Sequence, residues 1–202
     1  MCRRNLRRPG KTLRAFAALL LLVAAGPACA QQPIRAPEVE AAYLVNFLRY
    51  TEWPQHTFAS AQAPYVVTVI GSEPEAQSVR AVAQAAGLIN GRSIEVRQVP
   101  KVRDPDHAKN KQNMETLRSS HLVFFHASAG NVSQQDLAPL AGQPVLTVSD
   151  VPGFAADGGM LGLLTSAGHI VFEANPDVIR QSGLLVSAKV LKLARTPAGT
   201  LP

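Results

Sequence analysis

The stretch YVVTVIG, residues 65–71, decides the fold that this sequence predicts. Six residues dominated by valine and isoleucine are closed by Gly71, a pattern typical of a strand buried on both faces. Residues 74–86 follow with apolar side chains at spacings of three and four, so a helix comes directly after the strand. A buried strand that leads into a helix is the repeating unit of a parallel sheet.

Strands and helices alternate along the rest of the sequence, which predicts an α/β fold. We expect a three-layer sandwich with a central, mostly parallel sheet and a C-terminal antiparallel hairpin that turns at residues 166–168. The expected strands are residues 65–70, 93–99, 121–126, 144–148, 160–165 and 169–173. The expected helices are residues 38–50, 74–86, 113–119, 133–140, 176–181 and 184–194, with residues 101–113 as a loop.

Residues 1–30 are predicted to be a secretory signal peptide. They contain six basic residues and no acidic one, then an apolar run over residues 15–26, then Ala28-Cys29-Ala30. The apolar run is shorter than the roughly 20 residues that a bilayer requires, so we expect cleavage after Ala30 and no stable membrane span. The expected product has a disordered lead-in (31–37), one domain (38–196) and a flexible tail (197–202).

Cleavage would change the charge and the cysteine content. The chain has 20 basic and 14 acidic residues, and the signal peptide holds six of the basic ones, which leaves 14 of each sign. The basic face that nucleic-acid binding requires is therefore not predicted. Cys2 and Cys29 are both removed, so the exported product would have neither disulfides nor thiol chemistry.

No catalytic motif stands out in the sequence, and we predict that the protein is not an enzyme. His121 and His126 are the only close pair of histidines, and at five residues apart on a strand they point to opposite faces. We therefore predict no catalytic residues, no cofactor and no metal site. A hydrolase that uses Asp150 and Asp157 with a metal is the least favoured alternative, because neither acid has a histidine at ligand spacing.

A glycine-rich loop that follows the strand 144–148 is the candidate ligand- or partner-binding segment. Ligands of open α/β sheets bind at the carboxyl ends of strands, and Asp150 lies just past such an end. The alternative is structural, with Asp150 capping a turn and Asp157-Gly158 forming another. The candidate residues are Asp150, Phe154, Asp157, Gly158 and Gly159.

A candidate partner surface combines aromatic and basic side chains. Tyr50 and Trp53 lie near the end of the first helix, and such residues are enriched at interfaces, although core packing is the alternative. Lys189 and Lys192 are three apart on the last expected helix, where they could contact an acidic partner or form a solvated face.

Several segments of this sequence, taken in their order along the chain, resemble the YfiR-like (YfiR/HmsC-type) family of periplasmic proteins. The first two are AAYLVNFLRYTEWP (41–54), similar to the family's opening helix, and VTVIGSEP (67–74), similar to its first strand and turn. The C-terminal half adds LTVSDVPGF (146–154), GGM (158–160), VFEAN (171–175) and residues 182–195 in the family's order and spacing.

The resemblance implies a small periplasmic α/β protein, often dimeric. It implies binding to the periplasmic sensor region of an inner-membrane diguanylate cyclase, which is held inactive so that cyclic di-GMP and biofilm formation stay limited. Some relatives carry redox-sensitive disulfides, which this chain lacks after cleavage. The alternative function is a periplasmic small-molecule-binding protein that feeds a sensor or a transporter.

Overall fold

The computed structural model describes residues 36–197. The predicted signal peptide with its cleavage site, nearly all of the lead-in and most of the tail lie outside this range. No helix within the described range has the length and hydrophobicity that crossing a membrane requires.

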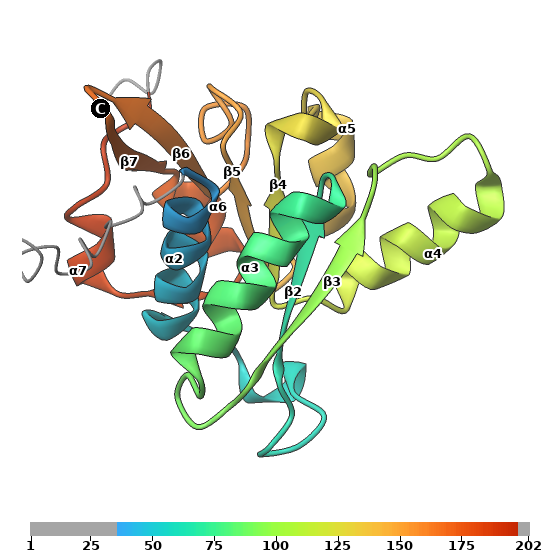
Figure 1. Ribbon diagram of the computed structural model, residues 1–202, viewed down its shortest axis with the longest axis horizontal. Helices are drawn as coiled ribbons and strands as arrows, with labels where there is room; N and C mark the ends of the chain where they lie inside the picture. Colours follow the sequence, from blue (N-terminus) through green and yellow to red (C-terminus); the bar gives the residue numbers. More distant parts are fainter. Residues whose placement is uncertain (1–35, 198–202) are drawn as a thin grey trace, which may run out of the picture. The chain divides into compact units, whose positions relative to one another are not determined.

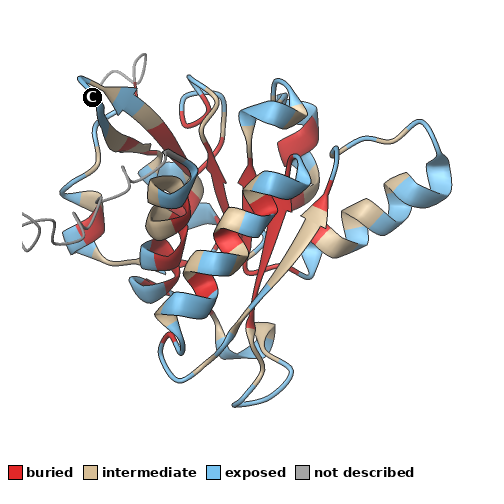
Figure 2. Ribbon diagram, viewed as in Figure 1, coloured by how far each residue is buried: buried red, intermediate tan, exposed pale blue. Residues whose placement is uncertain are grey.

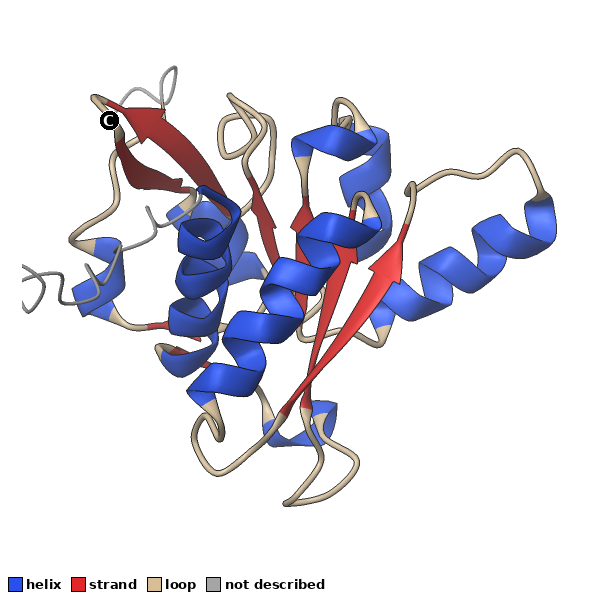
Figure 3. Ribbon diagram, viewed as in Figure 1, coloured by secondary structure: helices blue, strands red, loops and turns tan. Residues whose placement is uncertain are grey.

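A six-stranded sheet in the order β3-β2-β4-β5-β6-β7 forms the centre of the domain (Figure 3). The strands from β3 to β6 in this order are parallel to one another, whereas β6 and β7 form an antiparallel hairpin. Ala167 and Gly168 both have positive φ, as a tight hairpin turn requires. The strands are β2 (Tyr65–Ile70), β3 (Ile94–Val99), β4 (Leu122–Phe125), β5 (Leu146–Ser149), β6 (Leu161–Ser166) and β7 (His169–Ala174).

Helices cover both faces of this sheet, so the predicted three-layer α/β sandwich is confirmed (Figure 1). The helices α2 (Ala36–Arg49) and α3 (Glu73–Ala86) pack on one face. The other face is covered by α4 (His107–Arg118) and α5 (Gln134–Leu137), with the 3-10 turn Ala138–Leu140. The central strands β2, β4 and β5 are buried along their whole length, which explains their unbroken apolar runs (Figure 2).

The region before β4 corrects the prediction of a loop over residues 101–113. The helix α4 begins at His107, where Asp106 Oδ1 caps it by accepting a hydrogen bond from the amide of Ala108 at 2.9 Å. Leu117 is the only buried residue described in this helix. A helix that buries so little has no apolar stripe, so periodicity could not reveal its first two turns.

The C-terminal segment corrects the prediction of a helix over residues 184–194. The helix α6 spans Pro176–Gln181, and Gly183 has a φ of +74°, a conformation that prevents the helix from continuing. The strand β8 (Leu185–Val186) then pairs with β1 (Thr51–Glu52) in a second, antiparallel sheet, and the helix α7 is reduced to Ala188–Leu191. This pairing joins segments more than 130 residues apart, which local sequence patterns do not encode.

Candidate functional site

The order of the strands places a switch point between β2 and β4. From β2 the chain moves to β3 on one side, then crosses to β4 on the other. Ligands of open α/β sheets bind at such points, outside the carboxyl ends of the strands. Here the carboxyl ends of β2, β4 and β5 lie side by side and lead into Gly71, His126 and Asp150.

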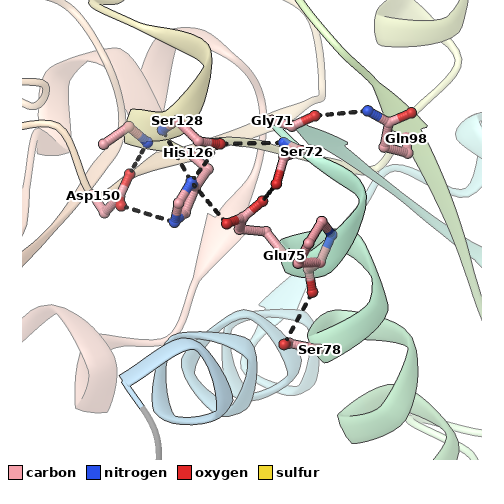
Figure 4. Close-up of polar contacts among 10 residues, drawn as sticks. Gly71, Ser72, Glu75, Ser78, Gln98, His126, Ser128 and Asp150 are labelled. Carbon is pink, nitrogen blue, oxygen red and sulfur yellow. Dashed lines mark hydrogen bonds and ion pairs between the residues drawn. The ribbon is translucent and has the colours of Figure 1, made fainter.

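Four titratable side chains meet at this edge and form what we call the carboxylate–histidine cluster. The imidazole of His126 lies between two carboxylates, with Nε2 3.4 Å from Asp150 Oδ2 and Nδ1 4.0 Å from Glu75 Oε1 (Figure 4). Glu40 of α2 completes the cluster, since one ligand-type atom from each of Glu40, His126 and Asp150 lies within 4.8 Å of the others. All four side chains are partly buried.

Backbone amides hold the cluster in position. The amide of Ala127 donates to Asp150 Oδ1 at 2.7 Å, and the amide of Ser128 donates to His126 Nδ1 at 3.1 Å. Ser128 Oγ lies 2.9 Å from the same Nδ1 and accepts from the amide of Ser72 at 3.2 Å. The loops that follow β2, β4 and β5 are thus joined through one imidazole and one carboxylate.

Glycine at position 71 permits this close approach. A Cβ built on Gly71 would lie 3.0 Å from Ser128 Oγ and 3.1 Å from His126 Cβ, tighter than ordinary side-chain contacts. A larger residue would therefore displace the imidazole or the hydroxyl.

The electrostatics of the cluster disfavour additional negative charge. Burial raises the pKa of Glu40 to about 7, and the charges of Asp150 and Glu75 contribute to the rise. Burial also raises the pKa of Asp150, against the opposing effects of His126 and of the Ala127 amide. The pKa of Glu75 is lowered even though burial acts to raise it, because the Ser72 hydroxyl and His126 stabilise its ionised form.

A cavity of about 310 Å³ opens beside the cluster. Glu40 and Asp150 contribute its polar wall, and the rest of the wall comes from the β5–β6 loop and the β6–β7 hairpin. The other lining residues are Pro152, Leu163, Leu164, Thr165 and Ile170. The carboxylates therefore face a space that a small molecule or an ion could enter.

The structure separates the residues of the predicted ligand-binding loop. Asp150 belongs to the cluster, whereas Asp157 and Gly158 line a different cavity of about 240 Å³. Phe154 is 3% exposed and packs its ring 5.7 Å from that of Phe125. A Cβ on Gly159 would lie 2.1 Å from the Phe154 ring, so this glycine is required for packing.

The residues of the predicted partner surface also differ from one another. Trp53 is 6% exposed and belongs to the core, so its side chain is not available at the surface. Tyr50 is 45% exposed, and its carbonyl accepts a hydrogen bond from the amide of Ser187 at 2.9 Å, next to Leu185, which is 67% exposed. Lys189 and Lys192 are exposed and follow β8 in the chain.

Sequence reasoning found Asp150 but missed Glu40, Glu75 and His126. The prediction that neither Asp150 nor Asp157 has a histidine at ligand spacing is wrong for Asp150, because β4 and β5 are parallel neighbours and their carboxyl ends bring His126 to 3.4 Å. The two residues are 24 positions apart, so no local spacing links them. The available signal was that both follow the last residue of a buried strand.

His126 lies between Ser128 Oγ and Asp150 Oδ2, as the histidine of a Ser-His-Asp catalytic triad lies between its two partners. The surroundings of Ser128 favour a positioning role instead, because its Oγ already accepts from the Ser72 amide and its own amide donates to the imidazole. Ser128 lies in the 3-10 turn Ala127–Ala129, which His126 caps.

The structure is an α/β domain with a cluster of charged side chains beside the switch point of its sheet. A comparison with protein families then places it more narrowly. The family model described as YfiR/HmsC-like matches residues 37–195, and the chain belongs to that family. The proteins of this family are periplasmic regulators in diguanylate cyclase signalling rather than enzymes.

Proposed function

We propose that the exported protein binds the periplasmic sensor region of an inner-membrane diguanylate cyclase and restrains the cyclase, which limits cyclic di-GMP. The observation that carries this proposal is the family match, which extends over nearly the whole described domain. Restraint needs no chemistry from the regulator. It needs only tighter binding to the inactive conformation of the partner than to the active one.

The surface around Tyr50 and Leu185 is our candidate for the contact with the cyclase. Both side chains are large and exposed; Leu185 lies in β8, and Tyr50 immediately precedes β1, the strand that pairs with β8. Lys189 and Lys192 add positive charge next to this surface, which favours a partner with acidic residues around an apolar centre.

Deletion of the gene tests the function. Cyclic di-GMP is expected to rise in the deletion strain and to return to its original level when the full chain is restored. A chain that lacks residues 1–30 is the matched control, because it should remain in the cytoplasm and fail to restore the level. An unchanged level in the deletion strain, or full restoration by the control, would contradict the proposal.

Capture of membrane proteins tests the surface. The tagged protein should retain a diguanylate cyclase from solubilised membranes, and Leu185→Asp should abolish the retention. Leu88→Asp is the matched control, since Leu88 is also 67% exposed but lies between α3 and β3. Equal retention by the two variants would exclude this surface.

A small-molecule-binding function is the second candidate, favoured by the cavity beside Glu40 and Asp150. The cavity includes Asp150, which follows the carboxyl end of β5, and ligands of open α/β sheets bind outside the carboxyl ends of the strands. A thermal-shift screen against metabolites would test it. A compound that stabilises the wild type but not Asp150→Ala would support it, whereas equal stabilisation of both proteins would contradict it.

A further inference from the structure

The carboxylate–histidine cluster lacks positive charge. Glu40, Glu75 and Asp150 are all partly buried, and His126 is their one basic neighbour among the ion pairs of residues 36–197. The lysines and arginines of that range that form ion pairs do so with other acids. Buried charges in proteins are normally paired or coordinate metals, so the cluster calls for a cation.

The separations within the cluster fit a metal ion better than a hydrogen bond. The distance of 3.4 Å between His126 Nε2 and Asp150 Oδ2 exceeds the usual 2.7–3.2 Å of an N–H···O bond. A tetrahedral Zn²⁺ with bonds of about 2.0 Å holds neighbouring ligand atoms about 3.3 Å apart. The donor atom of Glu40 lies within 4.8 Å of both others, so a small rotation of a flexible side chain would complete a three-ligand set.

The contacts around these ligands determine which atoms can coordinate a metal ion. Asp150 is fixed through Oδ1 by the Ala127 amide, which leaves Oδ2 directed toward the imidazole. In this structure Nδ1 accepts a hydrogen bond from the Ser128 amide at 3.1 Å, so coordination at Nε2 requires the ring proton to move to Nδ1 and that hydrogen bond to break. Ser128 Oγ at 2.9 Å would then accept the proton, and Glu75 lies beyond at 4.0 Å. Such outer contacts orient a ligating histidine and raise its basicity.

The adjoining cavity supplies both an entry path and an open coordination position. Glu40 and Asp150 line its wall, and its volume of about 310 Å³ leaves room for water or for an anionic group beside a bound ion. One imidazole and two carboxylates suit Zn²⁺ or a related transition metal, whereas Mg²⁺ and Ca²⁺ prefer oxygen ligands alone.

We propose that Glu40, His126 and Asp150 bind a divalent transition-metal ion, with Zn²⁺ as the best fit, at the carboxyl ends of β4 and β5. Glu75 and Ser128 position the imidazole, and the fourth coordination position faces the cavity. The site uses none of the residues of the proposed cyclase contact, so it is independent of that proposal.

Titration calorimetry with ZnSO4 tests the site on protein purified from the periplasm without a polyhistidine tag and stripped with EDTA. We expect one Zn²⁺ per chain, with the affinity lowered at least about 100-fold in His126→Gln and in Asp150→Asn. Ser128→Ala should lower it about 10-fold, as loss of an outer contact does. Millimolar Mg²⁺ should not compete.

Asp157→Asn is the matched control, since Asp157 lies in the same loop as Asp150 but lines the other cavity. It should bind Zn²⁺ as the wild type does, and circular dichroism should show each variant folded. Absence of stoichiometric binding by the wild type, or undiminished binding by both His126→Gln and Asp150→Asn, would overturn the proposal. Neither outcome bears on the cyclic di-GMP measurement.

Discussion

His121 and His126 lie at the two ends of β4, and their surroundings are opposite. His121 precedes the strand and is enclosed by rings, stacked on Phe58 at 4.4 Å and edge-on to Trp53 and Tyr65. His126 follows the strand and is surrounded by carboxylates beside an open cavity. One strand thus separates an aromatic end, where the imidazole is buried and packs against rings, from a charged end, where the imidazole lies among carboxylates.

The protonation state of His121 follows from its surroundings. The amide of Val66 donates to His121 Nδ1 at 3.0 Å, which identifies that nitrogen as unprotonated. Burial lowers the pKa of His121 to about 4, and the charges of Arg92 and Arg97 act in the same direction. His121 is therefore neutral and structural.

The largest expected effect is the loss of Trp53 at the aromatic end. Trp53 packs on Tyr65 and donates a hydrogen bond from Nε1 to the carbonyl of His121 at 3.1 Å. Trp53→Ala should lower the free energy of unfolding by about 3–5 kcal/mol in urea denaturation. Tyr50→Ala, at an exposed neighbour, should cost far less. Equal losses would show that the aromatic end is not the stabilising one.

The next effect is the pH dependence that His121 confers. Its pKa is about 4 in the folded state against 6.5 in the unfolded state, so the unfolded state binds more protons between these values. Stability is therefore present above pH 6.5 and lost as pH falls toward 4, by up to about 3 kcal/mol for this group. Tyr65, Arg92 and Arg97 are the other ionisable groups near it.

His121→Gln isolates this contribution, because the gap in unfolding free energy between wild type and variant should shrink as pH falls from 6.5 to 4. His107→Gln, which removes an exposed imidazole from the start of α4, should leave the gap constant. A constant gap for His121→Gln as well would show that this imidazole is not held neutral.

A smaller effect of opposite sign is expected at the charged end. Glu40 is one of three carboxylates crowded around a single imidazole, so Glu40→Gln should stabilise the metal-free protein by about 1 kcal/mol at pH 8. Glu38→Gln, an exposed acid in the same helix, should change the stability little. Destabilisation by Glu40→Gln in thermal or urea denaturation would contradict the crowding.

The two ends of the sheet also differ in how far sequence predicts them. The buried strands and their order along the chain follow from apolar runs such as residues 65–70 and 122–125, and position Asp150 at a strand end. The neighbours of Asp150 depend on which strands lie side by side, a property of the tertiary fold. Glu40 and Glu75 come from helices whose exposed faces give no functional signal.

At the aromatic end, the sequence suggested a surface position for a residue that is buried. Trp53 and Tyr50 are close in sequence and equally plausible as surface residues, yet Trp53 is buried because β1 and β8 pair across the end of α2 and direct it toward His121. The same pairing removed the predicted last helix. Both errors arise from the pairing of two two-residue strands, each too short to leave a periodic pattern.

Anomalous diffraction at the zinc edge, from crystals grown with Zn²⁺, tests most directly whether the carboxyl end of β4 binds a metal ion. The account predicts a peak about 2 Å from His126 Nε2, bonded to Asp150 and Glu40, and none near His121. No peak between these side chains, with zinc found only at exposed histidines, would contradict it.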